Sequence, residues 1–249
     1  MPTLGVVVLS RGKTKHLTEC LQSVSWADEV LLVHAGGGEP ELGNGKWPSL
    51  IIRNVPSLAG AEKHFAEIRT DWILQLWAEE RLDPDLADEI SALCRGPSRS
   101  GPESYRIAIC SHIMGKWLEG SVSGPSPAVR LSRKIESMPF GWWLEARSAE
   151  TLQRGCIQDH GCSELVRAVE RVQELSDWWA ANLQSAASSP GAFGTVLGSL
   201  KVFFKMLVID RLFSGGIAGV TLSALASYAV LLSGAKLWEA KHVGAKREA

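Results

Sequence analysis

The sequence predicts an α/β fold in which a mostly parallel sheet is flanked by helices. Short apolar runs typical of buried strands recur at residues 4–9, 26–33 and 72–76. The segments between them carry apolar residues at helical spacing, as Leu17, Leu21 and Val24 do. Strands that alternate with helices favour right-handed crossovers and a doubly wound, Rossmann-like sheet.

The elements of this fold follow one another through the first third of the chain. The strand at 26–33 has an acidic entry, Asp28-Glu29, and is followed by a glycine-rich turn. The predicted elements, in order, are a strand at 4–9, a helix at 14–24, a strand at 26–33, a short strand at 49–52, a helix at 61–68 and a strand at 72–76.

The stretch from Asp71 to Pro84 organises this half of the chain. Its apolar run predicts a strand buried on both faces, and the acidic residues that follow predict a loop at the strand's carboxyl end. Pro84 then opens a helix at 85–93. Ligands bind at the carboxyl ends of strands in open α/β sheets, and carboxylates there can hold a divalent ion and, through it, phosphates. The pattern therefore predicts a nucleotide site after this strand.

Composition narrows the class of protein. Apolar residues at 45% and charged residues at 21% describe a globular chain with an ample core. A formal net charge of −1 argues against general nucleic-acid binding, which needs a basic surface. The five cysteines are odd in number and never form C-x-x-C, which favours buried thiols in a reducing compartment. No secretory signal pattern opens the chain, because the apolar run at 4–9 is too short.

Two stretches resemble family 2 glycosyltransferases with the GT-A fold, in particular bacterial lipopolysaccharide-core and capsule transferases. These read W-I-L-x-L-D-A-D-E-R-L-x-P-x-L at the organising strand and C-L-x-S-V-x-W-A-D-E-I-V-V-V-D-S-G-S-T-D at the earlier one. The matches in the first stretch are Trp72, Ile73, Leu74, Leu76, Ala78, Glu80, Arg81, Leu82, Pro84 and Leu86. Those in the second are Cys20, Leu21, Ser23, Val24, Trp26, Ala27, Asp28, Glu29, Val30 and Val33. The resemblance implies a GT-A fold and transfer of a sugar from a nucleotide donor, UDP-linked or similar.

The chain departs from the family where the donor would bind. Trp77 stands at the family's first Asp and Glu79 at its second, and His34 replaces an Asp that typically contacts the base or ribose. Glu can replace Asp as an oxygen ligand, so the resemblance implies Mn²⁺ or Mg²⁺ held by Glu79. The residues expected to bind the donor are Arg11, His34, Glu39, Ala78 and Glu79.

The acceptor half resembles the family at Gly115, Trp117, Leu118, Pro125, Arg130, Leu131 and Arg133. Arg130 is a candidate phosphate contact, because its planar fork suits that geometry; the alternative is an arginine paired with a nearby carboxylate. Glu145 stands at the Glu of a V-H-E sequence in the relatives, which implies the general base for the acceptor hydroxyl. His160 falls where relatives have L-x-H, and is otherwise a hydrogen-bonded structural residue.

The C-terminal part changes in composition. Apolar residues from Phe193 to Val208 follow helical spacing with Lys201 and Lys205 beside them, which is typical of an interfacial helix and also of a core-facing one. The uncharged run 212–235 is long enough to cross a bilayer, and Lys and Trp residues follow it. The tail also resembles that of lipopolysaccharide-core transferases at Ala235, Lys236, Leu237, Trp238 and Glu239. We expect interfacial helices on the inner, cytoplasmic face of the cell membrane; a single span at 212–235 is the alternative.

The expected domains are a GT-A domain at 1–160 (nucleotide half about 1–95, acceptor half about 96–160), a helix and hinge at 161–190, and a membrane-associated tail at 191–249. The first functional hypothesis is a transferase that acts on a lipopolysaccharide, lipid-linked or cell-surface glycan acceptor at the membrane surface. The second is an inactive relative that binds a partner or glycan, with Trp77 filling the nucleotide's place. Nucleotide binding distinguishes the two.

Overall fold

The computed structural model describes residues 3–12, 15–43, 45, 47, 49–58, 61–96, 102–122, 126–133, 149–184 and 191–247. Glu145 and the expected hinge at 185–190 lie outside these residues. The chain divides into two compact units, Met1–Cys110 with Ser126–His160, and Ser111–Pro125 with Gly161–Ala249. The polypeptide therefore enters the second unit twice.

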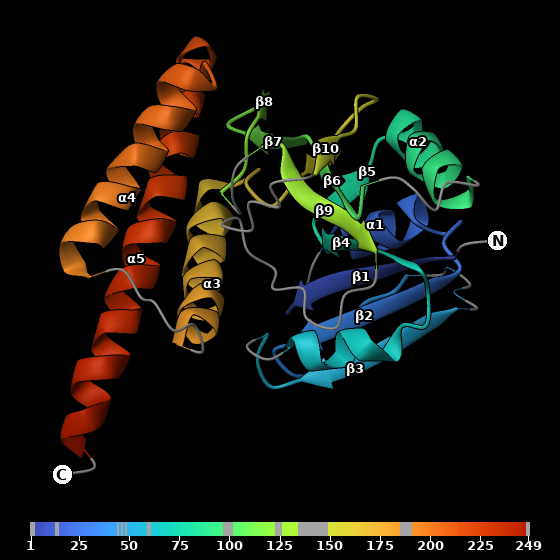
Figure 1. The fold of residues 1–249 in the computed structure, drawn as a ribbon, viewed down its shortest axis with the longest axis horizontal. Helices are drawn as coiled ribbons and strands as arrows, with labels where there is room; N and C mark the ends of the chain where they lie inside the picture. Colours follow the sequence, from blue (N-terminus) through green and yellow to red (C-terminus); the bar gives the residue numbers. More distant parts are fainter. Residues whose placement is uncertain are drawn as a thin grey trace. The chain divides into compact units, whose positions relative to one another are not determined.

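The first unit is built on a seven-stranded sheet with the order β10-β6-β9-β4-β1-β2-β3 (Figure 1). Strands β4, β1, β2 and β3 run parallel, whereas β9 is antiparallel to both β4 and β6. This confirms the predicted α/β class with a mostly parallel sheet. The strands are β1 (Leu4–Arg11), β2 (Glu29–Ala35), β3 (Leu50–Val55), β4 (Trp72–Trp77), β6 (Ser104–Ile107), β9 (Ala128–Arg133) and β10 (Glu150–Thr151).

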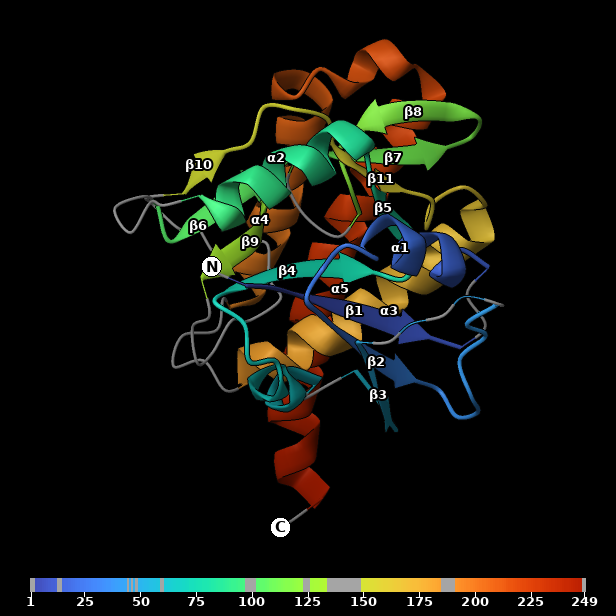
Figure 2. The same ribbon diagram turned by 90° about the vertical axis from the view of Figure 1, so that its right-hand side faces the viewer.

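Helices cover the central strands. Leu17 and Leu21 of α1 (Leu17–Ser23) and Ile90 of α2 (Pro84–Arg95) share one hydrophobic cluster with the side chains on one face of β1 and β4. Figure 2 shows α1 and α2 over this face. Every residue of β4 is buried, which explains why its sequence reads as one apolar run rather than an alternation. A Cβ on Gly5 would collide with the Ile68 side chain, so a glycine is needed where the chain packs closest.

The region after β4 is more ordered than the sequence indicates. The expected acidic loop contains a short strand, β5 (Glu80–Leu82), which pairs antiparallel with β11 (Ile157–Asp159). Asp83 Oδ1 then accepts a hydrogen bond from the Asp85 N–H (3.0 Å) and caps α2, with Pro84 in the first turn. The helix expected at 61–68 is a 3₁₀ helix, Ala61–Glu67.

Most of the described residues of the second unit lie in helices, and a hairpin adds two strands. The strand β7 (Ile109–Ile113) leads the chain into it, and the unit's residues of β7 pair antiparallel with β8 (Lys116–Glu119). Helices α3 (Leu165–Gln184) and α4 (Ala192–Phe204) each pack along α5 (Ile217–Arg247), as Figure 1 shows. A π-helical turn (Lys205–Ile209) and a 3₁₀ turn (Leu212–Gly215) connect α4 to α5. The helical spacing seen at 193–208 is thus confirmed.

Candidate functional site

The carboxyl ends of β4, β1 and β2 meet at one edge of the sheet in the first unit. Leu9 of β1 is in register with Trp77 of β4, and Arg11, the last residue of β1, with Ala35 of β2. Parallel strands end together at such an edge, which is where open α/β sheets bind ligands. The structure therefore brings the expected donor residues of three strands to one place.

A glycine-rich turn follows β2 at this edge of the sheet. The Gly12 N–H donates a hydrogen bond to the Ala35 carbonyl (2.9 Å), which holds the chain after β1 against the end of β2. Gly36, Gly37 and Gly38 all have positive φ angles (108°, 74° and 94°), a conformation that side chains oppose. A Cβ on Gly36 would also lie 3.3 Å from the Gly12 nitrogen. Glycine is therefore required here, and the exposed residues Arg11 and Glu39 flank the turn.

The His34 side chain lies inside the protein and is not exposed at this edge of the sheet. Its side chain is buried, and Nδ1 lies 3.3 Å from the Ser10 Oγ on the neighbouring strand. Burial lowers the pKa of His34, because the charged imidazolium is disfavoured away from water. The ring is therefore neutral at pH 7. The neutral ring can donate one hydrogen bond and accept another, but it does not supply the negative charge of the family's Asp.

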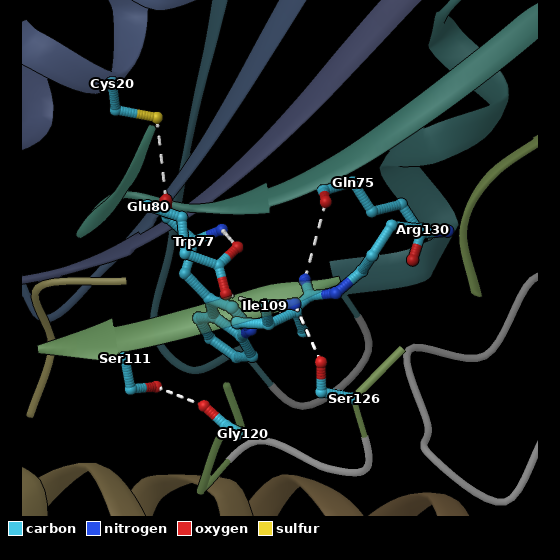
Figure 3. Close-up of polar contacts among 9 residues, drawn as sticks. All are labelled: Cys20, Gln75, Trp77, Glu80, Ile109, Ser111, Gly120, Ser126 and Arg130. Carbon is cyan, nitrogen blue, oxygen red and sulfur yellow. Dashed lines mark hydrogen bonds and ion pairs between the residues drawn. The ribbon is translucent and has the colours of Figure 1, made fainter. Parts of the chain in front are cut away.

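Trp77 and Ala78 are also buried. The Trp77 N–H donates to the Glu80 Oε2 (2.9 Å), and its carbonyl accepts a hydrogen bond from the Cys20 thiol (3.5 Å; Figure 3). The Ala78 N–H donates to the Leu9 carbonyl (2.9 Å), which continues the β1–β4 pairing beyond the strand. The residue at the family's first Asp position thus packs into the protein and offers no carboxylate to a ligand.

Arg130 lies in a buried ion pair with Glu80. Its Nη2 is 2.8 Å from the Glu80 Oε1, and the two side chains are 6% and 0% exposed. Arg130 Nη1 also donates to the Gln75 carbonyl (3.4 Å), so the pair joins β4, the start of β5 and β9 (Figure 3). This is the alternative that the sequence left open for Arg130, an arginine paired with a nearby carboxylate. The pair holds the turn that positions Glu79.

Glu79 and His160 are neighbours. The His160 N–H donates to the Glu79 carbonyl (3.0 Å), and both residues are partly exposed. The His160 ring stacks on His16, with centroids 4.7 Å apart and planes at 25°. Burial, and secondarily the nearby His16, lowers the pKa of His160. A neutral imidazole therefore stands beside the acidic turn, supported by His16, whose Nδ1 is 3.1 Å from Glu19 Oε2.

The described residues do not complete a metal centre. No group of three or more His, Cys, Asp or Glu side chains among them is arranged to hold an ion. Glu80, the carboxylate next to the expected ligand Glu79, is held by Arg130 and the Trp77 N–H. Mg²⁺ is commonly held by one or two carboxylates together with waters and substrate phosphates, so Glu79 would supply one ligand of the expected divalent ion.

Sequence reasoning missed the parts that support the site. Ser10 and His16 had no signal of their own, and Cys20 matched the family without any indication of its contact; each acts through a contact with a distant residue. Glu80 and Arg130 both matched the family, yet their pairing across fifty positions could not be seen in one sequence. The short spacing from Trp77 to Glu80 was the one local indication of a closed turn.

No protein-family model matches the chain. Among solved structures, Rv0371c from Mycobacterium tuberculosis H37Rv in complex with manganese aligns at 13% identity, 66% of this chain, 95% of that chain and a TM-score of 0.39. A second Rv0371c structure aligns at 13% identity over 70% of this chain and 97% of that chain, with a TM-score of 0.36. A putative glucose-1-phosphate thymidylyltransferase from Bacillus anthracis in complex with sucrose aligns at 9% identity over 73% of this chain and 84% of that chain, with a TM-score of 0.33. These values describe a coarse likeness of fold, from which neither a residue role nor a ligand is transferred.

The edge combines a cationic side chain, an acidic one and a turn of exposed backbone. Arg11 and Glu79 come from the ends of β1 and β4, and Gly36–Gly38 from the end of β2. A guanidinium and backbone N–H groups are groups that bind phosphate, and a carboxylate accepts hydrogen bonds from hydroxyls. The arrangement is suited to an anionic ligand that also carries hydroxyl groups.

Proposed function

We propose that the chain is a glycosyltransferase-like protein that binds a nucleotide sugar at the carboxyl edge of β4, β1 and β2. Its sugar would pass to a lipopolysaccharide, lipid-linked or cell-surface glycan acceptor. The observation that carries the proposal is the gathering of Arg11, the Gly36–Gly38 turn and Glu79 at that edge. The family resemblance of the sequence around β2 and β4 adds the sugar-transfer chemistry.

In this proposal the donor's diphosphate lies against Arg11 and the glycine turn. Arginine keeps its positive charge at every relevant pH and can bind two phosphate oxygens at once. The absence of side chains at Gly36–Gly38 lets backbone approach the ligand closely. Arg11 would then offset the charge that develops on the leaving diphosphate, which is the largest electrostatic demand of the reaction. Glu79 would accept a hydrogen bond from a sugar or ribose hydroxyl.

On the acceptor side, a hydroxyl oxygen forms the new bond to the sugar's anomeric carbon while the bond to the diphosphate breaks. The hydroxyl proton must pass to a base. The family resemblance assigns this role to Glu145. His160 is the second candidate, because its lowered pKa keeps the ring in the neutral form that can accept a proton. Phosphate binding by Arg130 would require it to share its guanidinium with Glu80.

A second function, binding of a partner or glycan without turnover, is favoured by one specific observation. Trp77 is 6% exposed at the position of the family's first Asp, and its N–H is bonded to Glu80. A tryptophan at this position removes a carboxylate that would act on the donor. Binding of a glycan or protein partner without binding of a nucleotide would select this function.

The proposed location is the inner, cytoplasmic face of the cell membrane, where glycolipid acceptors are present. The support is the composition of the second unit, in which Ala192–Ile209 and Ile217–His242 are long and apolar enough to cross a membrane. The near-neutral net charge gives no support to nucleic acid as a partner.

Calorimetric titration with UDP and GDP, with and without Mn²⁺, tests the donor site. We expect micromolar binding that is strengthened by Mn²⁺ and that weakens at least tenfold in Arg11→Ala. Arg95→Ala, an exposed arginine at the end of α2, is the charge-matched control and should bind as the wild type does. Absence of binding under every condition would overturn the proposal, and a strict requirement for Mn²⁺ would show that residues outside the described ones complete a metal site.

A further inference from the structure

The second unit carries all of the exposed large apolar side chains among the described residues. Soluble proteins rarely expose so much contiguous apolar surface without a partner. On α5 the exposed positions follow one stripe along the helix: Ile217, Val220, Ala224, Tyr228, Leu231, Ala235 and Trp238. On α4 and the turn after it they are Phe193, Val196, Leu197, Leu200, Phe204, Val208 and Ile209.

The contact between α4 and α5 includes small and hydroxyl-bearing residues. Ser227 Oγ donates to the Ser199 carbonyl (2.9 Å), and a Cβ on Gly234 would collide with the Thr195 side chain. Other positions of α5, such as Leu222 and Leu225, are buried, whereas the exposed large apolar side chains lie outside these contacts. This is how helices pack in lipid, where apolar side chains need not be hidden from the surroundings.

The net charge of residues 191–249 indicates what kind of partner covers the exposed apolar surface. Residues 191–249 contain seven Lys and Arg against three Asp and Glu, a net charge of +4 in a chain whose total is −1. Lys201 is exposed beside the apolar face of α4. A basic, apolar and aromatic surface complements a bilayer with anionic headgroups. A second copy of the chain would carry the same positive charge.

Contacts at the turn between α4 and α5 argue against a crossing. The turn packs on the β7–β8 hairpin, where Lys116 Nζ donates to the Gly215 carbonyl (3.2 Å) and Gly120 faces Leu212. The segment Ser111–Pro125 is joined to the first unit at both of its ends. To carry the turn through a bilayer, the chain would have to cross twice more in this segment, whose described part contains no helix.

The other end of α5 is held by polar groups of α3. Lys236 Nζ contacts Asp177 Oδ1 (2.6 Å), Ser176 Oγ (2.7 Å) and the Gln173 carbonyl (3.1 Å). Helix α3 also carries exposed charges, such as the pair of Arg167 with Glu170. If α5 spanned the membrane, these groups of α3 would enter the hydrocarbon, where charges are rare and costly. Both ends of α5 are therefore tied to parts that would not cross the hydrocarbon.

We propose that the α4–α5 hairpin lies in the plane of one face of an anionic bilayer without crossing it, and that the tip of the β7–β8 hairpin enters the interface beside it. The tip is apolar and exposed: Met114 is 49% and Trp117 45% exposed. Tryptophan is enriched at the headgroup level, where its ring and its N–H are both accommodated. This inference rests on the membrane location in the proposed function and adds its geometry.

Flotation with sealed vesicles tests the lipid surface. The full-length protein should bind vesicles of phosphatidylcholine with phosphatidylglycerol and bind phosphatidylcholine alone at least tenfold more weakly. Met114→Ser with Trp117→Ser should lower binding about fivefold or more, whereas Arg95→Ala in the first unit should leave it unchanged. Both serine replacements are at exposed positions, and an unchanged thermal unfolding midpoint by circular dichroism would show that the variant is folded. Self-association without vesicle binding, or unchanged binding of the double variant, would overturn the proposal.

Labelling tests the orientation. Ser214→Cys in the turn and Ala240→Cys near the far end of α5 are both at exposed positions. Inside-out membrane vesicles from bacterial cells that express each variant are treated with a membrane-impermeant maleimide, and the modification is read by peptide mass mapping. Each cysteine should be modified to the same extent before and after detergent is added. Protection of one of them until detergent is added would show a span and overturn the planar orientation. Because this readout needs no nucleotide, it fails independently of the proposed donor site.

Discussion

The two units differ in what they leave on the surface. In the first unit large apolar side chains fill the space between the sheet and its helices, and polar groups inside it are paired, as Glu80 is with Arg130. The second unit also buries large apolar side chains, such as Trp179 and Leu222, but it carries all of the exposed large apolar side chains among the described residues. This exposed surface is what the proposed lipid contact would cover. Each prediction below tests one side of this comparison.

The largest effect is expected at the buried ion pair of the first unit. Removing one member of a buried pair leaves the other charge uncompensated, which costs about 3–5 kcal/mol. Glu80→Ala should therefore lower the free energy of unfolding by that amount in urea titrations. Glu80→Met with Arg130→Met should recover a large part of it, because no charge then remains buried.

The control for this pair is exposed. Arg53 and Glu67 form a salt bridge at 2.7 Å, but their side chains are 45% and 31% exposed. Arg53→Ala should produce little measurable change, since solvent screens such pairs. If Glu80→Ala behaved like Arg53→Ala, the pair would have no role in holding the Trp77–Glu80 turn.

In the second unit the corresponding prediction concerns the close packing of α4 against α5 rather than a charge pair. Gly234→Leu places a side chain against Thr195 of α4 and should destabilise the α4–α5 contact by about 1–3 kcal/mol, the usual cost of overpacking. Limited proteolysis of the unit should become faster. The neighbouring Ala235→Leu adds a side chain of the same size on the exposed stripe and should leave proteolysis unchanged. Equal effects of the two changes would contradict the small-residue contact.

Acid should destabilise the first unit through its histidines. Burial lowers the pKa of His34 in the folded protein, so the unfolded chain binds the proton more readily. Stability is then complete above the ordinary histidine pKa, about 6.5, and falls as the pH drops below it. His34→Asn should reduce the loss of the urea midpoint between pH 7.5 and 5.5, and His160→Asn should reduce it further. A pH dependence that neither change alters would contradict the burial of these rings.

The smallest effect concerns the thiols. Burial raises the pKa of Cys94 to about 12, and that of Cys20 well above its ordinary value. The thiolate is the reactive form, so both should resist alkylation at pH 8. The partly exposed Cys110 and Cys156 should react first, as measured by mass spectrometry of tryptic peptides. Rapid modification of Cys20 in folded protein would contradict its position under Trp77.

The sequence predicted most strands and helices of the first unit because each is marked locally by an apolar run or a helical spacing. The run at 72–76 became β4, and Pro84 begins α2 as expected. The site was predicted as a set of strand ends, but the burial of Trp77 and the pairing of Arg130 depend on contacts between distant residues. A single sequence gives no signal for such contacts.

For the second unit the sequence predicted apolar helices but not what surrounds them. The hairpin at Lys116 was assigned to the acceptor half, whereas in the structure its contact to Gly215 places it with the helices. Helix α5 also continues past the uncharged run to Arg247, and within it Lys236 is paired with Asp177 of α3. Periodicity identifies a helix, and only the packed structure shows which of its sides is covered.

The division of function between the units can be measured in one experiment with two readouts. Binding of UDP by calorimetry and binding of anionic vesicles by flotation would be compared in Arg11→Ala and in Met114→Ser with Trp117→Ser. We predict that the first variant loses nucleotide binding at least tenfold and keeps vesicle binding, and that the second does the reverse. Loss of both properties in either variant would contradict a donor site in the first unit and a lipid surface in the second; no nucleotide binding by the wild type would contradict the donor site alone.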